Sequence, residues 1–391
     1  MALPSMSPRT RARSRAAERP ASPAPSAPAS AAASARPRFE WIDAGKGACM
    51  VLVVLLHLSL MFENEVNEGP AALWWDVSAA FAPLRMPLFF FISGFLATRA
   101  VSRPLGQTRG RTLGILSVYA IWTLLFLARL YVPQARGGGA APTPGQLLLS
   151  VALPTSYWYL WALPVFFVVA WACTRVLGRH RAWALVAFAA LAVAAPALKP
   201  LTAGLLTEPL DAVKLGSVSA NLVWFFAGIV GRDAWLGLMR RATWLTAAAG
   251  ILAYAGVFAL LRATGHGPVL TFAIAGVALL ASNQVLAVVG MANPLSRALR
   301  WVGRQTLPVY VFHIFLVSAL SAALKLAGLV PLLREHTYVW GAILPIALLV
   351  PVVVASRVIG AVVLASPLRW MLEGPRWLTA SRAPAPEAVA R

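Results

Sequence analysis

Residues 339–364 read V-W-G-A-I-L-P-I-A-L-L-V-P-V-V-V-A-S-R-V-I-G-A-V-V-L and contain a single charged residue, Arg357. A helix needs about 20 mostly apolar residues to cross the hydrocarbon core of a bilayer. This run exceeds that length, and soluble domains rarely contain a core helix so long and so apolar. The stretch therefore predicts a transmembrane helix.

Comparable runs recur along almost the whole chain of 391 residues. Hydrophobic residues make up 59% of it and charged residues only 12%, whereas soluble domains carry about 25% charged residues. We predict an all-α, polytopic integral membrane protein of about ten transmembrane helices. The predicted spans are 44–62, 77–97, 112–131, 158–176, 182–198, 217–231, 243–261, 268–291, 306–328 and 339–364.

Positive charge lies in short clusters between these runs. The formal net charge is +21, which in a soluble protein would suggest a nucleic-acid partner. In membrane proteins, Lys and Arg accumulate in the cytoplasmic loops, and with ten spans every second loop is richer in arginine than its neighbours. This alternation predicts that both termini are cytoplasmic, and it argues against nucleic-acid binding.

Two segments are expected to flank the membrane domain. Residues 1–38 consist mainly of Ala, Pro, Ser and Arg, and such a composition cannot bury enough apolar surface to fold. We expect 1–38 to be a disordered basic tail near anionic lipid. Residues 39–370 would form the ten-span membrane domain, and residues 371–391 a cytoplasmic C-terminal tail.

The first predicted span carries polar residues on one helix face. Asp43, Lys46, Met50 and His57 follow one another at steps of three, four and seven residues, which places them on one side of a helix. Asp43 and Lys46 can form an ion pair, and His57 lies about 16 Å farther along, near mid-membrane. Because ionisable groups inside a membrane are functional candidates, His57 is a candidate catalytic residue. The structural alternative for His57 is a histidine that packs and hydrogen-bonds to a neighbouring helix. For Asp43 and Lys46 it is an ion pair that anchors the helix at the interface.

Arg85 and His313 are further ionisable residues within predicted spans. Arg85 stands between Pro83 and Pro87, and prolines can free backbone carbonyls that line a cavity. Arg85 is therefore a second candidate catalytic residue, although an arginine can also extend toward the interface. His313 and Asp43 are candidate supporting residues. The alternative for His313 is a packed, hydrogen-bonded histidine, and the alternative for Asp43 is an interfacial ion pair that anchors the helix.

Arg109 and Arg111 form an R-G-R sequence immediately before the third predicted span. Guanidinium groups match phosphate oxygens, so the pair could bind a phosphorylated ligand, although topology also explains it. The sequence lacks nucleotide-binding fingerprints and clustered metal ligands, and Cys49 and Cys173 lie inside apolar runs. We predict no metal, and a catalysis that uses acid–base and cationic groups.

Four segments, in this order, resemble the membrane acyltransferase 3 family. They are R-F-E-W-I-D-A-G-K-G-A-C-M-V-L-V-V-L-L-H (38–57), L-R-M-P-L-F-F-F-I-S-G-F-L (84–96), Y-W-Y-L-W-A-L-P-V-F-F (157–167) and V-G-R-Q-T-L-P-V-Y-V-F-H (302–313). The similarity covers residues 39–370 and is greatest to the fucose 4-O-acetylase-like branch. Four motifs in order are more specific than any one of them, but they identify no substrate.

The resemblance implies an enzyme of the bacterial inner membrane that moves acyl groups, often acetyl, from cytoplasmic acyl-CoA to carbohydrate on the far side. It implies that His57 acts as a general base or becomes transiently acylated. Lys46, Arg109 and Arg111 would bind the anionic end of acyl-CoA. Many members have Arg at the position of Lys46, and lysine lacks the bidentate fork. Arg85 would stabilise an oxyanion or hold the acceptor.

The sequence thus predicts an O-acyltransferase with acyl-CoA, foremost acetyl-CoA, as donor and an envelope carbohydrate or glycolipid as acceptor. Two alternatives stay open. One is a glycan or lipid transporter or flippase, in which His57 and Arg85 line a proton-coupled path. The other is an acyltransferase with a lipid or peptide acceptor. Membrane lipid is the expected surrounding, and the oligomeric state is left open.

Overall fold

The structure is a computed structural model that describes residues 39–66, 71–136, 143–202, 213–265 and 267–379. Regular structure within these ranges is helical throughout, and no strand occurs in them. The prediction of an all-α fold is confirmed. The predicted basic tail, residues 1–38, lies outside the described residues.

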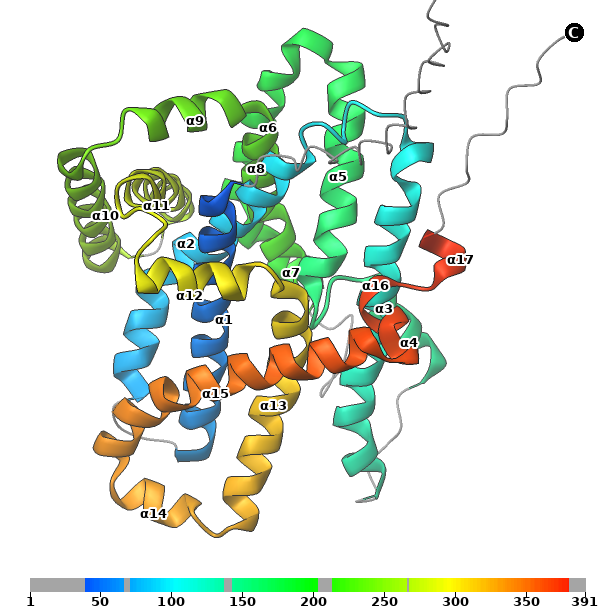
Figure 1. Ribbon diagram of the computed structural model, residues 1–391, viewed down its shortest axis with the longest axis vertical. Helices are drawn as coiled ribbons and strands as arrows, with labels where there is room; N and C mark the ends of the chain where they lie inside the picture. Colours follow the sequence, from blue (N-terminus) through cyan, green and yellow to red (C-terminus); the bar gives the residue numbers. More distant parts are fainter. Residues whose placement is uncertain (1–38, 67–70, 137–142, 203–212, 266, 380–391) are drawn as a thin grey trace, which may run out of the picture. The chain divides into compact units, whose positions relative to one another are not determined.

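Nine helices in the described residues are long and apolar enough to span a membrane (Figure 1). They are α1 (Glu40–Val66), α2 (Ala71–Ala97), α3 (Leu105–Arg136), α5 (Trp158–Val176), the continuous segment of η1 (Gly178–Trp183), α6 (Ala184–Ala194) and η2 (Ala195–Leu198), α10 (Trp244–Thr264), α11 (Pro268–Val288), α13 (Thr306–Leu326) and α15 (Thr337–Ala365). The shorter helices are α4 (Pro144–Ala152), α7 (Lys199–Thr202), α8 (Leu215–Val230), α9 (Arg232–Arg240), α12 (Pro294–Gly303), α14 (Val330–Glu335), η3 (Pro367–Arg369), α16 (Trp370–Glu373) and α17 (Arg376–Thr379). Each long helix corresponds to one predicted span, and the prediction of a polytopic membrane protein is confirmed.

The sixth predicted span, 217–231, is a short helix. It corresponds to α8, which has 16 residues and ends at Val230, just before Gly231. The chain bends there by 72° into α9. Ten spans are present in the described residues if α8 and α9 are counted together as one broken span.

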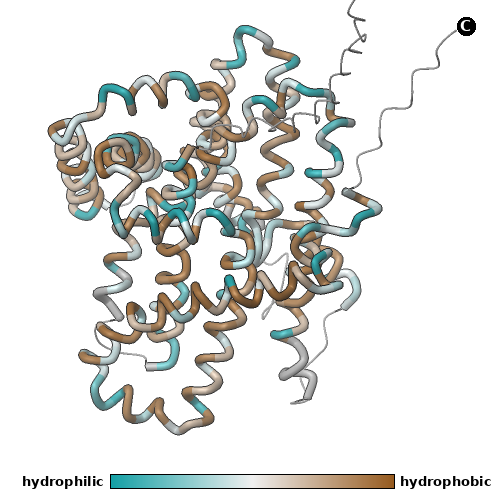
Figure 2. Tube along the Cα trace, in the orientation of Figure 1, coloured by the Kyte–Doolittle hydropathy of each residue, from teal (hydrophilic) through white to brown (hydrophobic). Residues whose placement is uncertain are grey.

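Large apolar side chains are exposed on the outer faces of α10 and α15. Leu245 and Leu252 of α10, and Val350 and Val358 of α15, are each more than half exposed. Such a surface is unfavourable in water, whereas hydrocarbon solvates it well. Figure 2 shows α15 as largely hydrophobic, while α9 and α12 carry many hydrophilic positions. The outer helices therefore face lipid.

Helix α1 packs against α2, α12, α13 and α15 (Figure 1). Glycines bring the backbones of α1 and α12 into contact. A Cβ atom on Gly47 would lie 1.9 Å from the carbonyl oxygen of Leu299, and one on Gly303 would lie 1.7 Å from that of Asp43. Small residues allow this close approach, which helps helices to associate in lipid. The contact fixes the first turns of α1 against α12.

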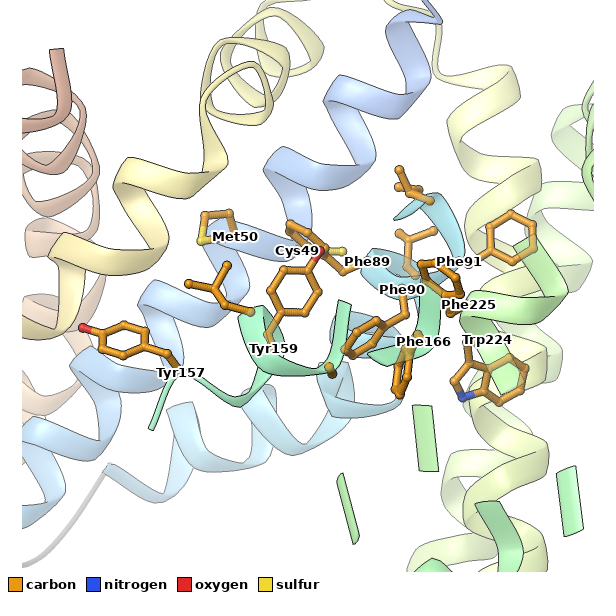
Figure 3. Close-up of a cluster of buried hydrophobic side chains, with 14 of the residues drawn as sticks. Cys49, Met50, Phe89, Phe90, Phe91, Tyr157, Tyr159, Phe166, Trp224 and Phe225 are labelled. Carbon is orange, nitrogen blue, oxygen red and sulfur yellow. The ribbon is translucent and has the colours of Figure 1, made fainter. Parts of the chain in front are cut away.

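Aromatic side chains fill the centre of the membrane domain (Figure 3). The ring of Phe89 meets that of Tyr159 edge to face, with centroids 4.8 Å apart. Phe90 packs against Phe166 at 4.9 Å and also against Tyr159. These contacts hold the first half of α5 against α2, and they fix the position of Tyr159.

One end of the helix bundle is rich in arginine. Helices α1 and α3 begin there, and α2 and α5 end there. Arg175 at the end of α5 donates a hydrogen bond of 3.1 Å to the carbonyl of Val101 after α2. Arg300 of α12 forms an ion pair with Glu40 at the start of α1. We call this the arginine-rich end and the other the opposite end.

The predicted C-terminal tail contains two short helices, α16 and α17, that pack against α3. Trp122 of α3 donates a hydrogen bond of 2.8 Å from Nε1 to the carbonyl of Met371. A Cβ atom on Gly110 would lie 2.7 Å from the carbonyl oxygen of Thr379. The chain therefore stays on α3 as far as Thr379, and residues 380–391 lie outside the described part.

Candidate active site

Two histidines from distant parts of the sequence meet inside the helix bundle. His57 lies on α1 and His313 on α13, and the distance from His313 Nε2 to His57 Nδ1 is 3.4 Å. Their rings are arranged edge to face with centroids 4.9 Å apart. His313 is buried and His57 is half-buried. The structure thus brings together the candidate catalytic histidine and one of its candidate supporting residues.

The hydrogen bonds of the two rings define their tautomers. His57 Nδ1 lies 2.9 Å from the carbonyl oxygen of Val53, and His313 Nδ1 lies 2.9 Å from that of Val309. A carbonyl oxygen can only accept, so each Nδ1 carries its proton. In a neutral ring the lone pair then lies on Nε2. His313 Nε2 can accept from His57 Nδ1–H, and His57 Nε2 is left as the basic atom.

A cavity of about 180 Å³ opens near the arginine-rich end between α1, α2, α3 and α5. Lys46 of α1 and Arg111 of α3 both line it. Thr108, Ser93 and Tyr159 add hydroxyl groups, and the remaining wall is mostly apolar and aromatic. We call this the arginine-end cavity. It combines two cations with an apolar interior, which suits a ligand that has an anionic head and an apolar arm.

The other two candidate residues of this region have different positions. Asp43 is buried and pairs with Lys46 at 3.7 Å, as predicted. Arg109 is exposed and belongs to no cavity wall described here. Helix α3 begins at Leu105, so the R-G-R sequence is already helical. Two residues then correspond to a rotation of about 200°, and Arg109 and Arg111 point to different sides.

Arg111 also lines a second hollow of about 390 Å³ between α3 and the C-terminal segment. Glu373 belongs to its wall, but this carboxylate already has a partner. Arg369 donates hydrogen bonds of 2.9 and 3.2 Å to Glu373, and these bonds lower the pKa of the Glu373 carboxyl group. No ion pair between described residues includes Arg111, so its charge is available to an anion.

Tyr159 and Ser93 form a contact that was not predicted from the sequence. The Tyr159 hydroxyl lies 3.0 Å from Ser93 Oγ in the wall of the arginine-end cavity. The Tyr159 ring lies 5.7 Å from that of Tyr310, and Tyr310 lies 6.2 Å from His313. Two tyrosine rings therefore separate the cavity from the histidine pair. The only signal in the sequence was the recurrence of tyrosine within apolar motifs.

Arg85 lies in α2 and is about nine-tenths buried. Its Nη1 donates 2.7 Å to Ser78 Oγ and 3.4 Å to the carbonyl of Leu52 on α1. Leu52 precedes His57 by five residues, which is about 7.5 Å along a helix. Arg85 also lines a cavity of about 860 Å³ at the opposite end. It lies close to α1, but it makes no hydrogen bond to either histidine.

Metal ligands do not cluster in the described part of the chain. No group of three or more His, Cys, Asp or Glu residues there could hold a metal ion. Cys49 and Cys173 are free cysteines, and neither forms a disulfide bond. The chemistry available at the site consists of imidazole, hydroxyl and cationic groups.

Two curated proteins show sequence similarity to the chain. The inner membrane protein YcfT of Escherichia coli (strain K12) is 29% identical over 158 residues, which cover 33% of this chain and 42% of YcfT. The nodulation protein NolL of Mesorhizobium japonicum is 28% identical over 203 residues, which cover 50% of this chain and 51% of NolL. The chain thus spans about half the length, or less, of the curated relatives that it matches. No solved structure matches it significantly.

The sequence profile of the acyltransferase 3 family, described as an acyltransferase domain, matches residues 39–365. The match begins one residue before α1 and ends with the last residue of α15. It therefore includes the long helices of the membrane domain, both histidines and the two cavities at its ends. The chain therefore belongs to the acyltransferase 3 family.

Proposed function

We propose that the protein is an O-acyltransferase of the bacterial inner membrane. It would move an acyl group, foremost acetyl, from cytoplasmic acyl-CoA to a hydroxyl group of an envelope carbohydrate or glycolipid. The proposal rests above all on the contact between His57 and His313 inside an acyltransferase domain. The relative YcfT is an inner membrane protein, which supports the inner membrane as the location.

The arginine-rich end would face the cytoplasm, because basic residues accumulate on that side of membrane proteins. Lys46 and Arg111 would then stand at the entrance for the donor. The arginine-end cavity, at about 180 Å³, is too small for a whole acyl-CoA molecule. We expect it to take the thiol arm, while the nucleotide stays outside the entrance.

His57 Nε2 would act as the general base. The acceptor hydroxyl oxygen attacks the thioester carbonyl carbon, and its proton passes to His57 Nε2. The tetrahedral intermediate then releases the CoA sulfur as the carbon–sulfur bond breaks, and the thiolate takes up the proton from His57. His313 would position His57 by accepting from Nδ1–H. It would also stabilise the imidazolium that forms, so it acts through His57 and not on the substrate.

Arg85 would bind the acceptor and would not contact the acyl-CoA donor. It lines the cavity at the opposite end and contacts α1 within about a turn and a half of His57. An acceptor in that cavity would approach His57 from the far side of the membrane. The donor thioester would reach the same histidine past Tyr159 and Tyr310.

Acyl transfer can be tested with the purified full chain in proteoliposomes. Radiolabelled acetyl-CoA is supplied on one side, and a mixture of envelope glycans, lipids and peptides on the other. Label in glycans or glycolipids, lost in His57→Gln, supports the proposal. Label only in sugar-free lipids or in peptides would overturn the proposed acceptor. Glycan movement across the bilayer without any label transfer would favour the transporter alternative.

A further inference from the structure

The cavity at the opposite end has the features of a built ligand site. It lies between α2, α8, α10 and α11 and measures about 860 Å³, which is in the range of small-molecule sites. We call it the opposite-end cavity. It is several times larger than the arginine-end cavity. Its wall is mostly apolar, with a few polar groups that converge on it.

Arg85 places an uncompensated positive charge at this cavity. None of the ion pairs between described residues includes it. Its hydrogen bonds use only Nη1, so Nε and Nη2 have no hydrogen-bond partner among the described residues. A buried cation without an anion is costly, and within a membrane it marks a functional site. A bound anion would remove this cost.

Asn221 is a second polar group in the same wall. It is more than nine-tenths buried, and its Nδ2 donates 2.8 Å to the carbonyl of Ser217. Its Oδ1 is buried without any hydrogen-bond partner in the structure. A buried acceptor that lacks a donor is destabilising. After a small rotation of the Asn221 side chain, this oxygen could accept a hydrogen bond from a hydroxyl group of a ligand.

Aromatic rings form another part of the wall. Trp224 and Phe272 stack on each other with centroids 5.1 Å apart, and both line the cavity together with Trp158. The apolar C–H face of a sugar ring packs well on such rings. Lys214 and Arg262 also line the cavity, and Arg262 pairs with Asp76 at 3.3 Å. Of these three cations only Arg85 is buried.

We propose that the opposite-end cavity binds the acceptor as an acidic sugar. Arg85 binds its carboxylate or phosphate group through Nε and Nη2, Asn221 accepts from a sugar hydroxyl, and the aromatic wall receives the ring. This inference rests on the proposed function, and it narrows the acceptor from carbohydrate in general to anionic carbohydrate. The carboxylate of a sugar acid and the phosphate of a sugar phosphate offer the same chemistry to Arg85.

Binding can be measured on the full chain in nanodiscs without any acyl donor. The probes are glucuronate, glucose 1-phosphate and the neutral methyl glucoside, titrated by calorimetry. We expect at least one of the two anions to bind at least tenfold more tightly than methyl glucoside. Arg85→Gln should remove this preference. Asn221→Leu should weaken all three probes and keep the preference for the anion.

Arg129→Gln is the matched control. Arg129 is another partly buried arginine within a long helix, hydrogen-bonded to Ser318, but it does not line this cavity. Its variant should keep the preference for the anion. If Arg85→Gln fails to fold, Arg85→Lys replaces it, and binding of the anion should weaken while a preference for it remains.

The outcomes separate this inference from the proposed function. Equal binding of the three probes, or an unchanged preference in Arg85→Gln, would overturn the acidic-sugar site and leave acyl transfer untouched. Anion binding that depends on Arg85, in a protein that transfers no acetyl group to any glycan, would keep the site and overturn the proposed reaction. Glucuronate and glucose 1-phosphate together show which anionic group the site prefers.

Discussion

His313 Nε2 lies 3.4 Å from His57 Nδ1, although 256 residues separate the two histidines in the chain. The proton on His57 Nδ1 is thereby shared between the carbonyl oxygen of Val53 and a second imidazole. His313 of α13 thus helps to fix the ring orientation of His57, and with it the position of His57 Nε2.

Replacement of His57 should abolish acyl transfer. General-base catalysis contributes about 10²- to 10⁴-fold to a rate, and His57→Ala and His57→Gln should both lose this factor. Glutamine keeps hydrogen-bonding capacity but cannot take up a proton at neutral pH. Activity is compared at equal amounts of membrane-inserted protein. A histidine that only packs would tolerate Gln, so full activity of His57→Gln would refute the catalytic role.

Replacement of His313 should lower kcat and leave KM for acyl-CoA unchanged. His313→Leu removes the acceptor for His57 Nδ1–H, and the loss of one hydrogen bond of about 1.4 kcal/mol corresponds to about tenfold in rate. His313→Gln retains an acceptor oxygen and should recover part of the activity. The pH dependence of kcat should also change in His313→Leu. An unchanged pH profile with a lower melting temperature would indicate packing alone.

Lys46 and Arg111 should affect the donor. Each lines the arginine-end cavity, so Lys46→Ala and Arg111→Ala should raise KM for acyl-CoA by about tenfold, since a charge-assisted hydrogen bond contributes about 1.5–3 kcal/mol. Arg109→Ala is the matched control, because Arg109 lies outside the cavity wall and should change KM much less. A larger effect of Arg109 than of Arg111 would contradict the placement of the donor in this cavity.

Gly303 should tolerate no side chain. In Gly303→Ala the new Cβ would lie 1.7 Å from the carbonyl oxygen of Asp43, so α12 must move away from α1. Overpacking of this kind costs about 1–3 kcal/mol or more. Gly256→Ala in α10 is the control, because no atom lies within 4 Å of its Cβ. Thermal unfolding in detergent should show a lower Tm for Gly303→Ala only, and equal Tm values would contradict the backbone contact.

Reporter fusions should test the orientation that the charge pattern predicts. Fusions at Gly178, Arg240 and Arg297 should report the cytoplasm, and a fusion at Gly145 should report the far side. Arg240 follows the bend between α8 and α9, so its report shows whether this pair crosses the membrane. A far-side signal at Gly178 would contradict the predicted orientation of the first four spans.

The spans could be predicted because apolar length alone decides whether a helix can cross a bilayer. The nine long helices follow that rule, whereas α8 does not reach the length, and hydropathy contains no information on the bend at Gly231. Predicting where a helix starts was harder. The third span was predicted to begin at residue 112, after Arg109 and Arg111, but α3 begins at Leu105 and includes both arginines.

The sequence allowed single residues of the candidate site to be predicted, but not the contacts between them. An ionisable group inside an apolar run can be recognised from the sequence, so His57, Arg85 and His313 could each be named. Their partners depend on how the helices pack. Nothing in the sequence indicates that His313 meets His57, or that Arg85 meets Ser78. Asn221 was missed because a single amide in a short apolar helix resembles an ordinary interhelical contact.

The docking of the C-terminal segment on α3 restricts what can stand between Arg109 and Arg111. The carbonyl oxygen of Thr379 lies 2.7 Å from the point where any Cβ at position 110 would be, so only glycine fits while α17 stays in place. The residue between the two arginines therefore indicates whether the C-terminal segment can pack on α3. A relative with a bulky residue there must hold its own C-terminal end elsewhere, and Gly110→Leu in this chain should release the last helix to added protease.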